Sequence, residues 1–131
     1  VDVRSYEWAT FYSDIRQGNF QLYSLRWIGV SDPDFLTELL HSRSTPPGGR
    51  NRGGYANPRV DALLEQARLE PDPARRAGQF REVQRIVHGE LPYLSLWHNA
   101  NVAVLSRRVA GFRLHPSGGF EHLPQVRWAG P

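Results

Sequence analysis

Two proline dipeptides in the middle of the chain constrain its fold more than any other feature, because each one marks the start of a helix. Asn57-Pro58 and Asp72-Pro73 both place a side-chain acceptor directly before a proline. The acceptor suits the N-cap of a helix, and proline suits the first helical position, where its missing N–H costs nothing. The sequence therefore predicts two consecutive helices that begin at these prolines.

Apolar side chains follow both starts at helical spacing, which gives each helix one face to bury against a partner. The two stripes are Val60, Leu63, Leu64 and Ala67 in the first helix, and Ala77, Phe80, Val83 and Val87 in the second. His88-Gly89 is a typical C-terminal stop for the second helix. The apolar run Leu91–Trp97 then predicts a strand.

Helices and strands are predicted to alternate in the rest of the chain. From Glu7, apolar residues recur at helical spacing until Gly18-Asn19, and Asp32-Pro33 is a third helix start. The run Phe20–Ile28 is apolar on both faces, as in a strand covered by helices on each side. Further short strands are predicted at Val1–Arg4, Tyr93–His98 and Asn101–Ser106, and the loop Ser42–Gly54 is expected to be mobile. These elements predict an α/β fold with a mixed sheet flanked by helices.

The composition excludes several kinds of site. Because the chain has no cysteine, it has no disulfide, thiolate metal site or thiol nucleophile. Its five histidines lack metal-ligand spacing and its serines lack a G-x-S-x-G context, so we predict no metal, no cofactor and no enzyme activity. All sixteen basic residues are arginines, scattered among acids, and they do not predict binding to nucleic acid. No segment resembles a signal peptide or a membrane span.

The order of the motifs resembles a known family. Helices containing VDALLEQAR and REVQRIV, followed by LPYLSLWH, are similar to the C-terminal portion of the bacterial extracellular solute-binding proteins of family 5, the peptide- and nickel-type binding components of ABC importers. The motifs RW at Arg26, DPD at Asp32 and NRGGY at Asn51 precede them in the family's order, and VAVLSRRVAGFRLHP at Val102 follows. The resemblance covers nearly the whole chain.

The resemblance implies a two-lobed, periplasmic-binding-protein-like fold of type II. Members of the family are roughly three to four times longer than this chain, which therefore resembles a C-terminal fragment. Residues 1–90 would complete the second lobe, and residues 91–131 would form a crossing strand and a tail that returns to the first lobe. Ligand would bind between the lobes.

Around the first strand, the resemblance implies that Trp27 is a wall of the ligand cleft, although an aromatic residue at a strand end also suits core packing. Peptide binders of the family place an aspartate three residues later, to pair with the ammonium group of the ligand. Val30 occupies that position here, which disfavours a free peptide amino terminus as ligand. Asp32 could take over the role of that aspartate, or it could cap the helix that follows.

At the crossing strand, Trp97, His98 and Asn99 occupy positions that face the cleft in relatives, and Asn99 could offer both a donor and an acceptor to peptide-like groups. Packing of alternate side chains is the other explanation of these residues. A nickel complex is an alternative ligand, which residues from the remainder of the protein would hold.

We therefore expect the substrate-binding component of an ABC importer, which binds a peptide or small polar molecule and delivers it to the permease. Its location would be periplasmic or extracytoplasmic. The alternative is a small stand-alone module that forms a homo-oligomer through the apolar surface left exposed where the other lobe is absent.

Overall fold

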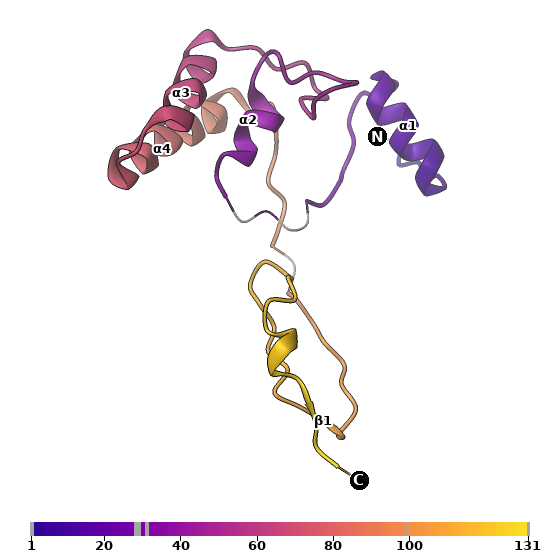
Figure 1. Ribbon diagram of the computed structural model, residues 1–131. Helices are drawn as coiled ribbons and strands as arrows, with labels where there is room; N and C mark the ends of the chain where they lie inside the picture. The colour runs from indigo at the N-terminus through magenta and orange to yellow at the C-terminus, as the bar shows by residue number, and fades with distance from the viewer. Residues whose placement is uncertain (1, 28–29, 31, 99, 131) are drawn as a thin grey trace. The chain divides into compact units, whose positions relative to one another are not determined.

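The computed structural model describes residues 2–27, 30, 32–98 and 100–130 of the chain (Figure 1). The chain divides into two compact units. The first comprises Val1–Leu25 and Asp32–Leu94, and the second comprises Arg26–Ser31 and Ser95–Pro131. The chain therefore passes from one unit to the other after Leu25, after Ser31 and after Leu94.

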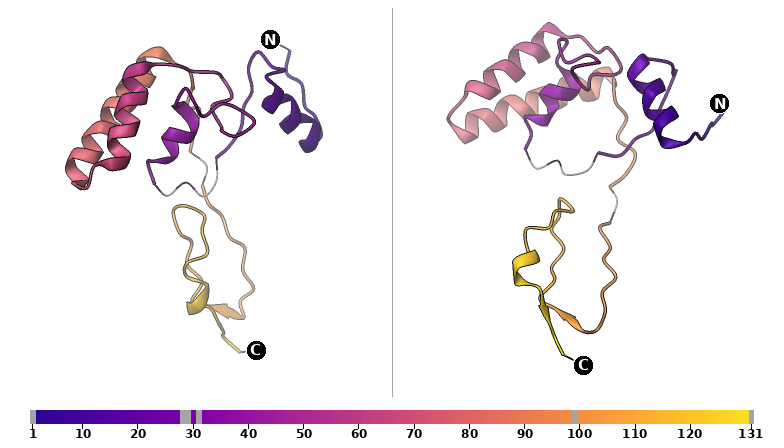
Figure 2. Two further views of the ribbon diagram at one scale, coloured as in Figure 1. Left: turned by 45° about the horizontal axis from the view of Figure 1, so that its top comes forward. Right: turned by 45° about the vertical axis from the view of Figure 1, so that its right-hand side comes forward.

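A pair of adjacent helices forms the centre of the first unit. α3 (Pro58–Leu69) and α4 (Pro73–Glu90) lie side by side, and the shorter α2 (Phe35–Leu40) contacts α3 (Figures 1 and 2). Their buried side chains are Leu39, Leu40, Val60, Leu63, Leu64, Ala67, Phe80 and Val83. The core thus contains all four stripe residues predicted for α3 and the two central ones predicted for α4.

Both central helices begin as the sequence predicts. The Asn57 side chain accepts hydrogen bonds from the backbone N–H groups of Arg59 and Val60, at 2.9 and 3.3 Å. Asp72 accepts from the N–H of Arg75 at 2.7 Å. Each cap satisfies N–H groups that have no partner within the helix, which typically contributes about 1 kcal/mol.

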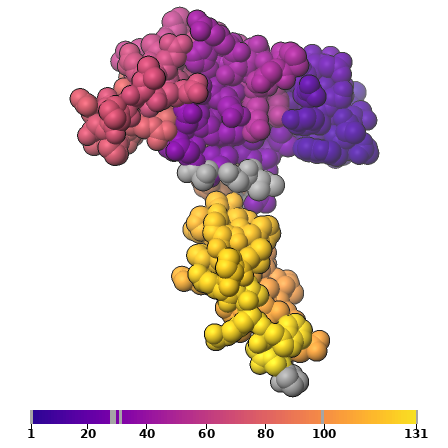
Figure 3. Space-filling view, viewed as in Figure 1, coloured from indigo at the N-terminus to yellow at the C-terminus, as the bar shows by residue number. Residues whose placement is uncertain are grey.

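α1 (Trp8–Gln17) also confirms the prediction from its pattern. Glu7 caps its start, and Gly18 ends it in the left-handed conformation, with φ of 76°. Ile15 is buried, whereas Trp8 is 59% exposed. The helix abuts the loop of residues 42–54, as Figure 3 shows, with Pro46 and Pro47 opposite its aromatic side chains.

The predicted C-terminus of α4 and the predicted N-terminus of α2 are wrong. α4 continues through His88-Gly89 to Glu90, because the Glu90 carboxylate accepts hydrogen bonds from the Tyr55 hydroxyl and the Asn57 side chain and so holds the last turn. α2 begins at Phe35 and not at Pro33, because the Asp32 side chain accepts from the N–H of Asp34 and the preceding residues form a turn.

The predicted mixed sheet is also wrong for the described residues. Their two strands are β1 (Val109–Ala110) and β2 (Arg127–Trp128), which pair antiparallel with Val109 opposite Trp128. Residues 2–4, 20–27, 91–98 and 101–106 hold no strand. A strand needs a neighbour for its backbone N–H and C=O groups, and a pattern of apolar residues does not supply one. The regular secondary structure of the described residues is therefore mostly helical.

The loop of residues 42–54, which we expected to be mobile, is fixed by the fully buried side chain of Asn51. Its amide nitrogen donates to the carbonyls of His41 and Tyr55 at 3.1 and 2.7 Å, and its oxygen accepts from the N–H of Tyr55 at 3.0 Å. The N–H of Asn51 donates to the carbonyl of Ser44 at 2.8 Å. One side chain thereby joins the end of α2 to the segment that leads into α3.

The second unit consists mainly of irregular chain. Besides β1 and β2 it contains a short 3₁₀ helix, η1 (Leu123–Gln125). The N–H of Ala129 extends the strand pairing with a bond to the carbonyl of Arg108 at 2.7 Å, and the Arg108 guanidinium lies 5.0 Å from the ring centroid of Trp128. None of the helices in the described residues is long and apolar enough to cross a membrane.

Replacing Asn51 with Ala is expected to lower the free energy of unfolding by about 3 kcal/mol, because it leaves the carbonyls of His41 and Tyr55 and the N–H of Tyr55 without the partner that this buried side chain provides. Urea denaturation measures the loss. The exposed Asn19→Ala is the control and should change stability by less than about 0.5 kcal/mol. A similar effect of both substitutions would contradict the role of Asn51.

Leu91→Gly is expected to raise the free energy of unfolding by up to about 1 kcal/mol, because Leu91 ends α4 with φ of 51°, a conformation that glycine adopts without a steric penalty. The Leu91 side chain is 58% exposed, so little burial is lost. Thermal melts compare it with Leu69→Gly, which replaces the exposed last residue of α3, where φ is not positive, and should destabilise the chain.

Candidate ligand-binding site

The six residues predicted to bind ligand fall into three groups. Trp27, Val30, Trp97 and His98 belong to the second unit, and Asp32 belongs to the first. Asn99 lies outside the described residues. Four of the predicted residues are therefore part of one compact unit, although they come from two distant stretches of the sequence.

A hydrogen bond links these two stretches within the second unit. The Arg26 guanidinium, next to Trp27, donates to the side-chain oxygen of Asn101 at 3.5 Å. The Asn101 amide in turn donates to the carbonyls of His115 and Pro116 at 3.4 and 2.9 Å. Asn101 thus holds three segments of the unit together. Sequence reasoning missed it, and its one signal was its place two residues after the last predicted site residue, Asn99.

Two tryptophans in these stretches present surface to solvent. Trp97 is 71% exposed, Trp27 is partly exposed, and Val30 is 44% exposed. His98 is also exposed. An exposed indole is a large, rigid surface that can pack against a ligand at low entropic cost. Trp97 is therefore not part of the core of the described residues.

Asp32 takes part in an ion pair within the first unit. The Arg76 guanidinium donates to its carboxylate at 2.8 Å and also to the carbonyl of Ala67 at 3.2 Å. The bond from Arg76, and then the bond from the N–H of Asp34, hold the pKa of Asp32 below its usual value. The neighbouring Asp34 lies 3.6 Å from the guanidinium of Arg68. Both carboxylates of the DPD motif therefore face an arginine.

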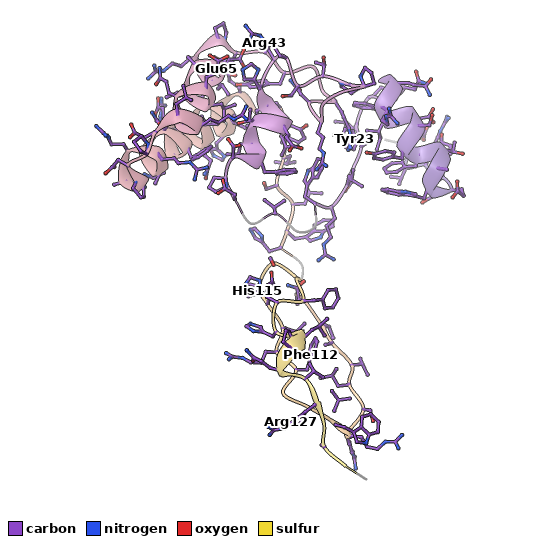
Figure 4. The ribbon with its side chains drawn as sticks, viewed as in Figure 1. Tyr23, Arg43, Glu65, Phe112, His115 and Arg127 are labelled. Atoms are coloured by element: carbon purple, nitrogen blue, oxygen red, sulfur yellow. The ribbon has the colours of Figure 1, made fainter. Side chains whose placement is uncertain are left out.

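A second charged cluster surrounds His41, which is only 7% exposed. Its Nε2 lies 3.3 Å from the Glu65 carboxylate, and its Nδ1 accepts from the N–H of Arg43 at 3.1 Å. Figure 4 shows Arg43 and Glu65 close together at this place. These contacts tie the start of the 42–54 loop to α3, so the cluster is structural.

The serine and histidine at the tip of the second unit form a turn and not a catalytic site. The Ser117 hydroxyl and the Ser117 N–H both lie against Nδ1 of His115, at 2.7 and 3.2 Å, and Glu121 approaches the same nitrogen at 3.8 Å. A catalytic triad needs the serine and the acid on opposite ring nitrogens. Among the described residues, no group of three or more His, Asp or Glu side chains is placed to hold a metal ion.

A separate hollow of about 590 Å³ lies beside α1 in the first unit. Its wall is formed by the exposed side of α1 from Trp8 to Gln17 and by Pro46 and Pro47 of the loop. Trp8 and Tyr12 stack there with ring centroids 5.4 Å apart. None of the five predicted residues that the structure describes lines this hollow.

Comparison with known proteins finds similar sequences in several proteins that are named as binding proteins. The chain is 30% identical over 118 residues to di/tripeptide-binding protein 2 of Pseudomonas aeruginosa, and 34% identical over 116 residues to heme-binding protein A of Haemophilus influenzae. It is 28% identical over 116 residues to the probable deoxycholate-binding periplasmic protein YgiS of Escherichia coli. These matches cover 88%, 87% and 88% of the chain, respectively. No protein-family model matches it.

These relatives define the class of protein, an extracellular solute-binding protein, and all three are named as binding proteins and not as enzymes. The chain belongs to family 5 of this class, as its motifs predicted. It spans only about a fifth of the length of these relatives, 22% of the first and 21% of the other two. The relationship implies that the chain folds as part of a periplasmic-binding-protein fold.

Asp32→Asn is expected to lower the melting temperature near neutral pH, because it removes the charge that pairs with Arg76 while keeping an oxygen for the N–H of Asp34. The lowered pKa of Asp32 means that its stabilising effect is present above its unfolded value of 3.8 and is lost as the pH falls through the lower folded value. The difference between wild type and variant should therefore shrink in acid. A difference that is independent of pH would contradict the pairing.

Proposed function

We propose that this chain is part of the substrate-binding component of an ABC importer. In the whole protein, two lobes close over a peptide-like or other small polar ligand and deliver it to the permease. The observation that carries this proposal is the similarity over 88% of the chain to a di/tripeptide-binding protein. The exposed Trp97 and the partly exposed Trp27, in stretches joined by Arg26 and Asn101, supply a surface suited to such a ligand.

In this proposal, residues 1–90 complete the second lobe, and residues 91–131 cross back to the first lobe of a type II fold. The division of the chain between Leu94 and Ser95 supports a boundary in this region. The hairpin of α3 and α4 then belongs to the scaffold, because its apolar faces are used in the core of the first unit. Hinge closure would couple ligand occupancy to docking on the permease.

The ligand would contact Trp27, Val30, Trp97, His98 and Asn99 of the second unit. Val30 offers no charge, and the carboxylate of Asp32 is already compensated by Arg76. Recognition of a free ammonium group would require breaking this ion pair, which would weaken binding of such a ligand. The three relatives are named for binding di- and tripeptides, heme and, as a probable ligand, deoxycholate, so their named ligands include molecules with and without an ammonium group.

The proposed location is periplasmic or extracytoplasmic, which is supported by the name of the Escherichia coli relative, a periplasmic protein. The proposed partners are the ligand and the permease subunits. Nucleic acid is not among them, because six of the arginines lie within 4.0 Å of acidic side chains: Arg43, Arg50, Arg68, Arg75, Arg76 and Arg85. Such pairing leaves these arginines less available to bind phosphates.

The test uses the full product of the gene that encodes this chain, titrated with trialanine and with its N-acetylated form in a calorimeter. Trp27→Ala and Trp97→Ala are each expected to weaken binding at least about tenfold, about 1.4 kcal/mol. Trp128→Ala, which removes a 63% exposed tryptophan next to Arg108, is the matched control and should leave affinity unchanged. Equal affinity in all three variants would contradict the assignment of the site.

A second candidate is a stand-alone module that associates with itself, favoured by the exposed apolar side chains of the second unit. Trp97, Val102 and Val104 are 71%, 80% and 95% exposed. Chain that exposes alternate apolar residues and lacks a strand partner is prone to pair with another copy.

Light scattering on this chain is expected to show a mass above the 14.9 kDa of one copy. The double substitution Val102→Lys and Val104→Lys should restore a monomer, because two buried ammonium groups would oppose the pairing. Val3→Lys is the control, because this valine is 91% exposed but lies in the first unit, and it should not restore a monomer. A monomeric wild-type chain at high concentration would exclude self-association.

A further inference from the structure

The division of the chain into two units also separates its charge. By sequence, the first unit holds eleven arginines and twelve acidic residues, a net charge of −1. The second unit holds five arginines and one glutamate, a net charge of +4 with its histidines neutral. Although the arginines are scattered along the whole sequence, the excess positive charge therefore lies entirely in the second unit.

Three arginines of the second unit gather at the β1–β2 pair. Arg107 and Arg108 form the turn that leads into β1, and Arg127, labelled in Figure 4, begins β2. The N–H of Ala129 donates to the carbonyl of Arg108 at 2.7 Å, which holds the turn beside the end of β2. All three arginines are exposed. The backbone pairing of this unit thus brings together positive charges that are about twenty residues apart in sequence.

No carboxylate of the described residues forms an ion pair with these three arginines. Glu121, the single acidic residue of the unit by sequence, instead approaches the ring of His115 at 3.8 Å. The printed neighbour of the Arg108 guanidinium is the indole of Trp128, whose centroid is 5.0 Å away. In contrast to the six paired arginines of the first unit, these arginines therefore keep their charge available to a partner.

Trp128 adds an apolar surface to this group of charges, because its side chain is 63% exposed. Successive side chains of a strand point to opposite faces, so Arg127 lies on one face of the pair and Trp128 with Arg108 on the other. An indole prefers the boundary between water and lipid, and guanidinium groups are attracted to anionic headgroups there. An acidic protein would pair with the arginines but would give the exposed indole no role, so these features favour a bilayer.

We propose that Arg107, Arg108, Arg127 and Trp128 form a docking surface for the anionic headgroup layer of a lipid bilayer. The arginines attract the phosphate groups, and the indole lies among the headgroups. Binding of this kind is peripheral and requires no membrane-spanning helix. The surface includes none of the residues proposed to contact ligand, so it goes beyond the proposed function and does not depend on it.

The test sediments the chain with vesicles made of phosphatidylglycerol and phosphatidylcholine in equal parts, and with vesicles of phosphatidylcholine alone. The chain is expected to bind the anionic vesicles only, and less tightly as salt is added. The double substitution Arg107→Gln and Arg108→Gln should weaken binding at least about tenfold, because each arginine near an anionic surface typically strengthens binding about fivefold. Trp128→Ala should also weaken it, while ligand affinity measured without vesicles stays unchanged.

The double substitution Arg59→Gln and Arg81→Gln is the matched control, because it removes the same charge from two exposed arginines of α3 and α4 in the first unit. It should bind anionic vesicles as the parent does. Equal weakening by both double substitutions would overturn the docking surface, since net charge alone would then explain the binding. Equal binding to vesicles of phosphatidylcholine alone would overturn it as well.

Two further measurements separate the remaining explanations. Binding of soluble polyglutamate without binding to anionic vesicles would overturn the proposal and indicate an acidic protein as the partner. The full gene product is sedimented in the same way, and its failure to bind vesicles would overturn the surface for the whole protein. Vesicle binding by a gene product that does not bind ligand would instead reject the proposed function alone.

Discussion

The side chain of Asn51 is the contact on which the rest of the first unit depends. Its amide bonds to two carbonyls and one N–H, and it connects the end of α2 to the start of the α3–α4 hairpin. An asparagine that is fully buried is stable only when its donors and acceptor are satisfied, and backbone groups satisfy them here. Arg52, the next residue, reaches Tyr12 on α1. Asn51 thereby sets the loop that links α1 to the other helices.

The helices could be predicted because their signals are local. The caps at Asn57 and Asp72 and the stripe from Val60 to Ala67 depend on residues within one or two turns, and the structure reproduces them. The end of α4 was missed because it depends on Tyr55, which is thirty-five residues away in sequence from Glu90. The role of Asn51 was missed for the same reason, since a glycine- and proline-rich loop gives no sign of a buried amide.

The strand predictions were wrong for a different physical reason. A helix satisfies its own backbone groups, whereas a strand requires the backbone of a second segment. The stretches 20–27, 91–98 and 101–106 have the composition of strands, but the chain supplies no described neighbour for them. Because the chain spans about a fifth of its relatives' length, the missing neighbours are explained if the rest of a longer protein provides them. Exposed Val102 and Val104 are what such an unpaired segment should show.

Contacts between distant segments also limit how much of the candidate site could be predicted from the sequence. The resemblance predicts Trp27 and Trp97 as site residues, and the structure adds that the hydrogen bond from Arg26 to Asn101 joins the stretches that carry them. The sequence left two roles open for Asp32, and the structure gives it a third, as the partner of Arg76 on α4. A carboxylate with a guanidinium at 2.8 Å attracts a second cation less strongly than a free one does, because the net charge of the pair is zero. The net charge beside Asp32 therefore depends on Arg76 of α4, a helix whose own sequence pattern predicts only packing.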